Sequence, residues 1–436
     1  MPKASPLLPA VQKHGDFDLT KELCDIILKQ QNRLLHRNRT MKKSRVRRVY
    51  FADYLITPDH IIPNGGVLCE NDRIIAVGGE SGFSRKEEDL EVVYFKNAYI
   101  TPGFIDTHIH GAGGFDCSRA ATSRNDLAAM SAILGKSGAT GFFPTVVADS
   151  PENMINNLRT LTSAMRLPLP GADAEGINIE GPFLNPEKSG AQPRSFLGKI
   201  DLKFASDLID AGEGMVKIMT FAPELENADK LIELLISRNV IASMGHSLAG
   251  EKETLRAIDA GATHCTHLFN GMNPLHQREV GLPGIVLTDD RVTVELIIDG
   301  RHVHSRMVDL ACRCKTLRQI IGISDGTMAS GIPDGEYHIG PAEIIVKEGF
   351  SQTSAGTLAG TTTMLDAGWH SLMSCGHLSE TKSALAVTRN PAEHYGLTDR
   401  GQLLPGLRAD LAVFERGTNR PLLTVRRGEV IAKAEE

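Results

Sequence analysis

The sequence predicts a (β/α)₈ barrel with a small β-sandwich domain built from both ends of the chain. Two observations predict the barrel: between about residues 98 and 396, short apolar runs alternate with helical stretches, and histidines or carboxylates follow the ends of those runs. A third observation predicts the sandwich, because strand-like runs bounded by Pro and Gly occur near both termini. A doubly wound open sheet is the alternative, but no G-x-G-x-x-G follows the first barrel run.

Composition narrows the class of protein. The chain has 436 residues, 41% hydrophobic and 23% charged, which is ordinary for a globular protein with one large core and a smaller unit. A net charge of −6 gives no general attraction to nucleic acid or anionic membranes. The sequence shows neither a membrane-spanning apolar run nor a secretory signal, and its seven scattered cysteines favour a reducing compartment. These features predict a cytoplasmic enzyme.

Residues 1–45 differ from the rest of the chain. A basic run from Arg37 to Arg48 follows apolar residues at helical spacing, namely Leu19, Leu23, Ile26, Ile27 and Leu34. We interpret this segment as an N-terminal extension that is helical or disordered, because a basic run is usually only solvated. Met41 is an alternative natural start. A nucleic-acid-binding arm is the competing interpretation and rests on charge alone.

A protein that begins at Met41 is therefore expected to fold and to turn over substrate like the full chain, because the extension lies outside both predicted domains. Thermal unfolding and kcat of the two forms measure this. Loss of activity in a folded truncated protein would show that residues 1–40 have a functional role.

The predicted sandwich comprises residues 46–97 and 397–436. Its strand-like runs are Val49–Ile56, Gly66–Glu70, Arg73–Gly78, Ala409–Phe414 and the strands within Leu422–Ile431. Because both segments consist of short strand-like runs bounded by turn residues, we expect both chain ends to contribute to one sheet unit.

The predicted barrel comprises residues 98–396. Its strands are expected at Ile100–Thr107, Gly141–Val147, Gly176–Glu180, Val216–Phe221, Val240–Gly245, Thr263–Thr266, Val292–Ile298 and Ile320–Ser324. Helices are expected at Ser123–Lys136, Pro151–Met165, Ala228–Arg238 and Glu251–Ala260. Such alternation indicates right-handed βα units and a parallel sheet.

Ionisable residues follow the ends of successive predicted strands. They are His108 and His110 after strand 1, Glu180 after strand 3, His246 after strand 5, His267 after strand 6, His302 after strand 7 and Asp325 after strand 8. The carboxyl ends of barrel strands meet at one face, so these side chains should converge. Imidazole and carboxylate ligands suit Zn²⁺ or a similar ion, which lowers the pKa of bound water, and a free carboxylate can then take a proton.

At these residues the chain resembles the amidohydrolase superfamily and, within it, the deacetylases of N-acetylated sugar phosphates. The likeness covers about Val46 to Ile431. The matching segments are Pro102–Gly114, Ile179–Pro193, Gly245–Ser247, Thr266–Gly284, Ile298–His302, Ile323–Thr327 and Leu358–Thr362. The His-x-His pair is shared by the superfamily, whereas the EGPF, HLFN and LAG segments are specific to the deacetylases.

The resemblance implies a metal centre. Glu180, His246 and His267 match the ligands common to the family, and His108 and His110 match a further site that only some members keep. One or two divalent ions per subunit are therefore expected, with Zn favoured and Fe, Mn and Co as alternatives. The resemblance also makes Asp325 the catalytic acid and base.

The resemblance further implies a site for a sugar phosphate, in a homodimer whose subunits can share phosphate contacts. The matching positions are Ala191, Asn270, Gly271, Arg278, Asp299, Gly300, Arg301, His302, Leu358, Ala359 and Gly360. A guanidinium such as Arg278 suits a phosphate dianion. One position departs from the family: many members carry His after Gly-Ala in the EGPF segment, where this chain has Gln192, which can donate a hydrogen bond but cannot carry charge.

The activity implied is hydrolysis of the acetamide of N-acetylglucosamine 6-phosphate to glucosamine 6-phosphate and acetate. Gln192 or His302, with the metal, would stabilise the oxyanion. Deacetylation of N-acetylgalactosamine 6-phosphate is the alternative within the fold, and adenine deamination is disfavoured because it does not call for Arg278. A non-catalytic assembly protein is the alternative from another class, disfavoured because such proteins typically lose metal ligands.

Overall fold

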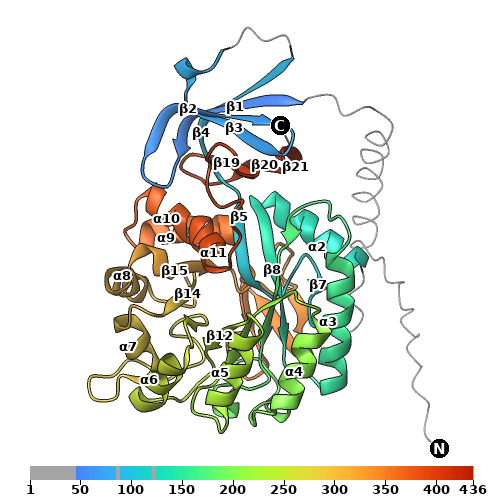
Figure 1. Ribbon diagram of the computed structural model, residues 1–436, viewed down its shortest axis with the longest axis vertical. Coiled ribbons are helices and arrows are strands. Elements are labelled where there is room, and N and C mark those ends of the chain that lie inside the picture. Colours follow the sequence, from blue (N-terminus) through green and yellow to red (C-terminus); the bar gives the residue numbers. More distant parts are fainter. Residues whose placement is uncertain (1–45, 85–88, 120–123, 436) are drawn as a thin grey trace, which may run out of the picture. The chain divides into compact units, whose positions relative to one another are not determined.

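The computed structural model describes residues 46–84, 89–119 and 124–435, so the predicted N-terminal extension lies outside the described residues. Eight parallel strands follow one another around a barrel in chain order (Figure 1). They are β5 (Phe104–Ile109), β8 (Ala139–Val147), β10 (Ile177–Glu180), β11 (Val216–Phe221), β12 (Ile241–Met244), β13 (His264–Cys265), β14 (Thr293–Ile297) and β15 (Ile320–Ile323). The predicted fold class is confirmed.

The first and last strands close the barrel through contacts at their carboxyl ends. The backbone N–H of Asp325 donates to the carbonyl of His108 over 2.9 Å, and that of His110 donates to Gly326 over 2.7 Å. The Asp106 carboxylate also accepts from the backbone N–H of Ser324. Closure therefore places the end of β5 directly against the end of β15.

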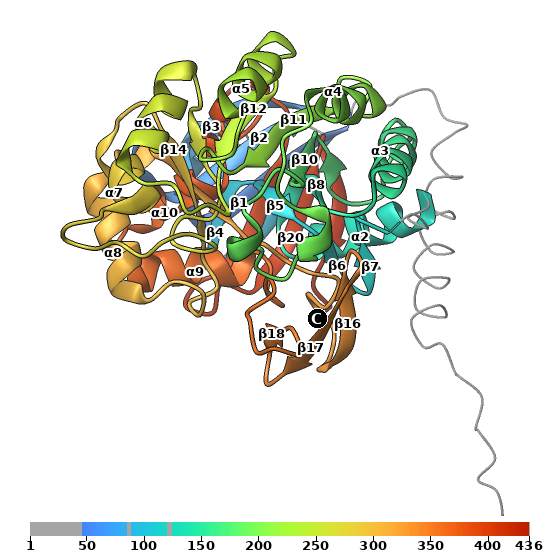
Figure 2. The same cartoon turned by 90° about the horizontal axis from the view of Figure 1, so that it is seen from below.

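Helices surround the barrel strands, as Figure 2 shows for α3 to α8. The helices are α2 (Arg124–Lys136), α3 (Pro151–Met165), α4 (Leu202–Ala211), α5 (Ala228–Ser237), α6 (Glu251–Ala260), α7 (Gly281–Thr288), α8 (Ser305–Cys314), α9 (Leu365–Cys375), α10 (Glu380–Val387) and α11 (Arg389–His394). Local capping fixes the start of α3, where the Ser150 hydroxyl accepts from the backbone N–H of Asn153 and Pro151 takes the first position. Between strands and helices lies the main apolar core.

The two chain ends form one seven-stranded sheet. Its order is β21-β20-β19-β4-β1-β2-β3, made of β1 (Arg47–Ile56), β2 (Ile61–Glu70), β3 (Arg73–Gly79), β4 (Leu90–Pro102), β19 (Leu411–Glu415), β20 (Pro421–Arg426) and β21 (Glu429–Lys433). β4 pairs in parallel with β1 and antiparallel with β19. The prediction that both ends share a sheet is confirmed. The predicted first barrel strand was wrong at its start, because Ile100–Pro102 belong to β4 and the barrel strand begins at Phe104.

A buried ion-pair network joins this sheet to the barrel. The Arg408 side chain is fully buried and contacts Asp410 as well as Asp173, at 3.3 Å, and Glu175, at 3.2 Å. Arg426 donates to the Asp173 carboxylate over 2.9 Å. Because Asp173 lies in the short strand β9 (Asp173–Ala174), which pairs with the barrel strand β8, these arginines hold the C-terminal strands to the barrel.

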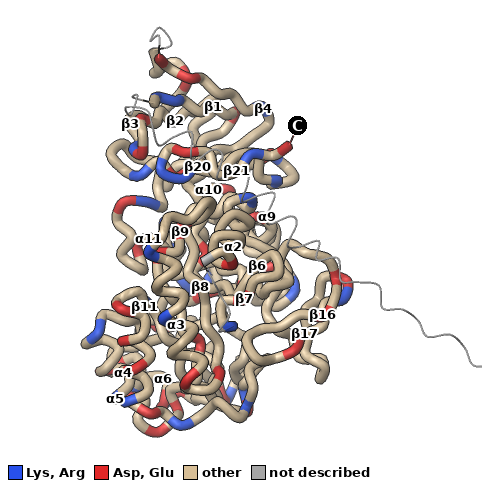
Figure 3. Tube along the Cα trace, turned by 90° about the vertical axis from the view of Figure 1, so that its right-hand side faces the viewer, with Lys and Arg blue, Asp and Glu red and all other residues tan. Residues whose placement is uncertain are grey.

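Smaller elements were not predicted. They are the hairpin of β6 (Gly111–Ala112) and β7 (Phe115–Asp116), the sheet of β16 (Gly335–Ile339), β17 (Ala342–Lys347) and β18 (Phe350–Gln352), and the 3₁₀ turns Glu80–Gly82, Pro186–Lys188, Arg194–Phe196 and Leu317–Gln319. Lys and Arg are interspersed with Asp and Glu along the described chain (Figure 3). Within the described residues, none of the helices has the length and apolar character needed to cross a membrane.

Candidate active site

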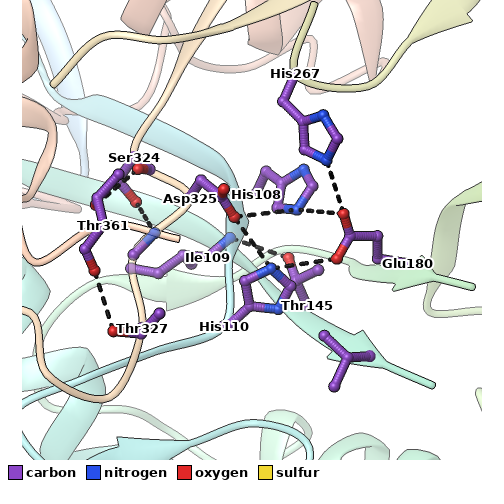
Figure 4. Close-up of polar contacts among 12 residues, drawn as sticks. His108, Ile109, His110, Thr145, Glu180, His267, Ser324, Asp325, Thr327 and Thr361 are labelled. Carbon is purple, nitrogen blue, oxygen red and sulfur yellow. Dashed lines mark hydrogen bonds and ion pairs between the residues drawn. The ribbon is translucent and has the colours of Figure 1, made fainter. Parts of the chain in front are cut away.

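Six ionisable side chains meet at the carboxyl end of the barrel and form two groups. His108, His110 and Asp325 make the first group, and Glu180, His246 and His267 make the second. In each group one ligand atom per residue lies within 4.8 Å of the others, and all six residues are buried. Figure 4 shows Glu180 and Asp325 on either side of His108 and His110. The predicted convergence of strand ends is therefore found in the fold.

The second group is the tighter one. Glu180 Oε1 lies 2.9 Å from Nε2 of His246 and 2.9 Å from Nε2 of His267, and these two nitrogens are 3.0 Å apart. Nδ1 of His246 donates to the carbonyl of Lys188 over 2.6 Å, so the Nε2 lone pair is directed into the group. Two imidazole nitrogens and a carboxylate oxygen around one point fit a divalent ion.

The first group adds a ligand that the sequence analysis did not assign. Asp325 Oδ1 lies 3.1 Å from Nε2 of His110 and 3.6 Å from Nε2 of His108. Nε2 of His108 is buried and has no hydrogen-bond partner among the described residues, which leaves its lone pair for a metal. Asp325 was predicted as acid and base alone, yet one of its oxygens also faces both histidines.

Glu180 lies between the two groups. Its Oε1 is 3.8 Å from His108 Nε2, and its Oε2 is 3.4 Å from His110 Nε2. Each carboxylate oxygen therefore has a histidine of the first group beside it, while Oε1 also serves the second group. The donor set fits a divalent ion in each group, with Glu180 within reach of both, in keeping with the one or two ions expected from the sequence.

The electrostatics keep both carboxylates ionised. Burial alone would raise the pKa of Glu180, but His246, His267 and His108 hold it well below its ordinary value. Burial likewise opposes ionisation of Asp325, while His110 and His108 lower its pKa below its ordinary value. Both side chains are therefore anionic at neutral pH, the form that binds metal and accepts protons.

Three of the site residues have strained backbones. His246, His267 and Asp325 all adopt positive φ, at 46°, 27° and 50°. At Asp325 the strained turn is held by Thr361, whose backbone N–H donates to the Asp325 carbonyl over 2.8 Å. Gly360 beside it has φ 58°, and a Cβ there would lie 2.7 Å from the same carbonyl oxygen. The LAG segment therefore supports the turn that presents Asp325.

The Gln192 side chain is hydrogen-bonded to Glu180. Its Oε1 accepts from the backbone N–H of Ala148 over 2.9 Å, which fixes the amide so that Nε2 donates to Glu180 Oε2 over 2.8 Å. The predicted role of Gln192 was to stabilise an oxyanion. Its observed contact orients the central carboxylate.

His302 forms a pair with Asp299. Nδ1 of His302 donates to Asp299 Oδ2 over 2.8 Å, and Oδ1 of the same carboxylate accepts from the backbone N–H groups of Arg301 and His302. The pKa of His302, which burial alone would lower, is raised by Asp299. The Arg301 side chain instead donates to the Gly349 carbonyl and stacks over Phe350.

The matching segment Thr266–Gly284 begins beside His267, a buried member of the second group, and reaches the surface at Arg278. Asn270 donates to the carbonyl of His267 over 3.3 Å, and Gly271, at φ 60°, lies so close to His246 that a Cβ would be 2.9 Å from the ring. Arg278 is exposed, and its guanidinium has no hydrogen-bond or ion-pair partner within residues 46–84, 89–119 and 124–435. Of the remaining predicted contacts, Ala359 is buried, and Ala191, Leu358 and Gly360 are half-buried.

Sequence comparison identifies the class to which this fold and site belong. Residues 99–432 match the amidohydrolase family model, so the chain belongs to the amidohydrolase family. Within that family, the chain is 33% identical over 380 residues to the N-acetylglucosamine-6-phosphate deacetylase of Bacillus subtilis, covering 86% of this chain and 95% of that one. It is 32% identical to the N-acetylgalactosamine-6-phosphate deacetylase of Escherichia coli O157:H7, covering 79% and 89%.

A solved structure agrees with these relatives. A mutant N-acetyl-D-glucosamine-6-phosphate deacetylase from Mycobacterium smegmatis, in complex with N-acetyl-D-glucosamine-6-phosphate, is 31% identical and superposes with a TM-score of 0.82. The superposition covers 89% of this chain and all of that one. The likeness therefore extends over both the barrel and the seven-stranded sheet.

Proposed function

We propose that the protein hydrolyses the acetamide of N-acetylglucosamine 6-phosphate, releasing acetate and glucosamine 6-phosphate. The observation that carries this proposal is the pair of buried donor groups joined by Glu180 at the carboxyl end of the barrel. The named relatives supply the substrate class. The same donor groups argue against a non-catalytic assembly protein, which has no use for six buried ionisable side chains.

Glu180, His246 and His267 would hold one divalent ion, and His108 and His110, with Asp325, would hold a second. Zn²⁺ suits these ligands best, and Fe, Mn and Co are alternatives. When bound, such an ion polarises the acetamide carbonyl and lowers the pKa of a water molecule.

The chain's own residues would perform the proton transfers. Asp325 takes a proton from the attacking water and delivers it to the leaving amine, because its carboxylate is ionised and one oxygen is free of His110. His302 is held through Nδ1 by Asp299 and would donate a hydrogen bond from Nε2 to the substrate in its protonated form, which Asp299 favours by raising the pKa of the ring. Gln192 keeps Glu180 in the orientation that serves both groups.

Arg278 would bind the 6-phosphate. An exposed guanidinium without an internal partner is suited to an anionic ligand, and in a homodimer it could reach the neighbouring subunit's site. We propose a homodimer and a cytoplasmic location, in keeping with a small phosphorylated substrate.

A panel of 6-phosphorylated N-acetylhexosamines tests the function, with acetate release as the measurement. We expect the highest kcat/KM for N-acetylglucosamine 6-phosphate. N-acetylgalactosamine 6-phosphate is the second candidate, favoured by the Escherichia coli relative. Failure to release acetate from either sugar phosphate by a metal-loaded protein would contradict the proposal.

Replacing His108 and His110 together by alanine is expected to remove one equivalent of metal and to leave the other in place. The reason is that the Glu180, His246 and His267 group makes its contacts without either residue. Metal content of protein purified with abundant Zn²⁺ measures the change. A wild-type content that never exceeds one equivalent would count against the first group.

A further inference from the structure

Glu295 is a carboxylate inside the barrel that no step of the proposed reaction uses. It lies in the middle of β14, where Val294 and Leu296 belong to the core between strands and helices. Side chains alternate along a strand, so Glu295 points to the opposite side, into the barrel interior, like Ile297. Its side chain is fully buried. A buried carboxylate is costly without partners, so its contacts indicate why it is there.

Both oxygens of Glu295 face histidines. Oε2 accepts from Nδ1 of His108 over 3.0 Å and from the backbone N–H of His267 over 3.3 Å. Oε1 lies 3.2 Å from Nε2 of His264, whose ring contacts His394 on its other side. Oε2 of Glu295 therefore contacts the ring of His108, which belongs to the first group, and the backbone of His267, which belongs to the second group.

The contact with His108 decides which ring nitrogen can bind a metal. Because a carboxylate oxygen only accepts, Nδ1 of His108 must carry hydrogen, and Nε2 is the nitrogen left to offer its lone pair. Nε2 is the buried atom without a hydrogen-bond partner in the described chain, 3.6 Å from Asp325 and 3.8 Å from Glu180. Without Glu295 the ring could rotate or change tautomer, and a carboxylate behind a ligating histidine also raises its basicity.

We infer that Glu295 is a positioning residue that fixes His108 and so sets the affinity of the first group (His108, His110 and Asp325) for a divalent ion. This inference rests on the proposed metal centre. Glu295 does not touch the ion, and it acts through the ring of His108.

Titration of Co²⁺ into chelator-treated full-length protein tests the inference, with the visible absorption bands and equilibrium dialysis reporting each equivalent. Glu295→Leu removes the acceptor and is expected to weaken binding of one equivalent by about 10- to 100-fold. The equivalent affected should be the one lost when His108 and His110 are replaced by alanine. Glu295→Met is a second apolar replacement if the leucine variant does not fold.

Glu295→Gln is the conservative rescue. Its amide oxygen can take the place of Oε2 and accept from both His108 and His267, while its NH₂ group faces His264. We expect this variant to keep most of the affinity that the leucine variant loses. Glu175→Gln is the matched control, because it removes a carboxylate from the Arg408 network. It should lower the thermal unfolding midpoint without changing Co²⁺ affinity.

The outcomes separate the inference from the function on which it rests. If the wild type binds two equivalents and the apolar variants bind both as tightly, Glu295 has a structural role only and the inference is wrong. If the wild type binds no Co²⁺, or binds one equivalent that is indifferent to His108 and His110, then the proposed first group falls and the inference falls with it.

Discussion

Replacing Asp325 by asparagine is expected to lower kcat by at least ~10²-fold, because the amide has nearly the shape of the carboxylate but cannot take a proton from water. Metal at Glu180, His246 and His267 should be retained, since Asp325 is not part of that group. Steady-state kinetics and metal content of the same preparation measure both effects.

Two comparisons sharpen this result. Asp309→Asn changes a carboxylate on the outer helix α8 that pairs with Arg313, and it should leave kcat unchanged. Loss of turnover together with loss of metal from the Glu180, His246 and His267 group would show that the substitution disrupts the whole site, and the proton-transfer role would then lose its support. Turnover near that of the wild type would move the acid and base role to another residue.

Replacing Arg278 by alanine is expected to raise KM for the phosphorylated sugar by an amount corresponding to ~2–3 kcal/mol, the range of a lost charge-assisted hydrogen bond. Use of unphosphorylated N-acetylglucosamine should barely change, since the guanidinium would have no phosphate to meet. Arg278→Lys keeps the charge but not the paired donors, so it should recover part of the loss. Arg313→Ala, an exposed arginine on α8, is the matched control.

Comparison of the two substrates shows whether Arg278 acts in phosphate binding, and a mixing experiment shows in which subunit's site it acts. Equal loss on phosphorylated and unphosphorylated sugar would place Arg278 in folding or assembly rather than in phosphate binding. If Arg278 serves the neighbouring subunit, mixing Arg278→Ala with Asp325→Asn, at a substrate concentration where each protein alone turns over slowly, should restore some activity in mixed dimers. Absence of rescue, with subunit exchange demonstrated, would assign Arg278 to the site of its own subunit.

The fold and most of the donor set could be predicted because both depend on periodicity along the chain. Apolar runs of strand length separated by helical stretches specify the barrel, and the barrel brings Glu180, His246 and His267 to one face. The start of the first barrel strand was missed since β4 and β5 are separated by Gly103 alone, so a single apolar run covers two sheets.

Contacts between distant residues could not be predicted in the same way. The hydrogen bond from Gln192 to Glu180 depends on the position of the Ala148 backbone, which residue spacing in the sequence does not reveal. Glu295 did leave a signal, because a lone carboxylate within the apolar run Val292–Ile298 is unfavourable unless something pairs with it. Its partner His108 lies 187 residues earlier in the sequence, so the pairing is visible only in the closed barrel.

The pairing of β4 with β19 has a consequence for how the protein is made. Pro102 pairs with Leu411, so the whole barrel must be synthesised before β4 can acquire its second neighbour. Until then that edge of the sheet exposes unpaired backbone groups, the arrangement that invites association with other chains. A chain that ends before residue 411 therefore contains all six proposed metal ligands, yet its β4 edge is exposed and can pair with another chain. The last strands of the chain cover the β4 edge and leave β21 as the outer strand on that side of the sheet.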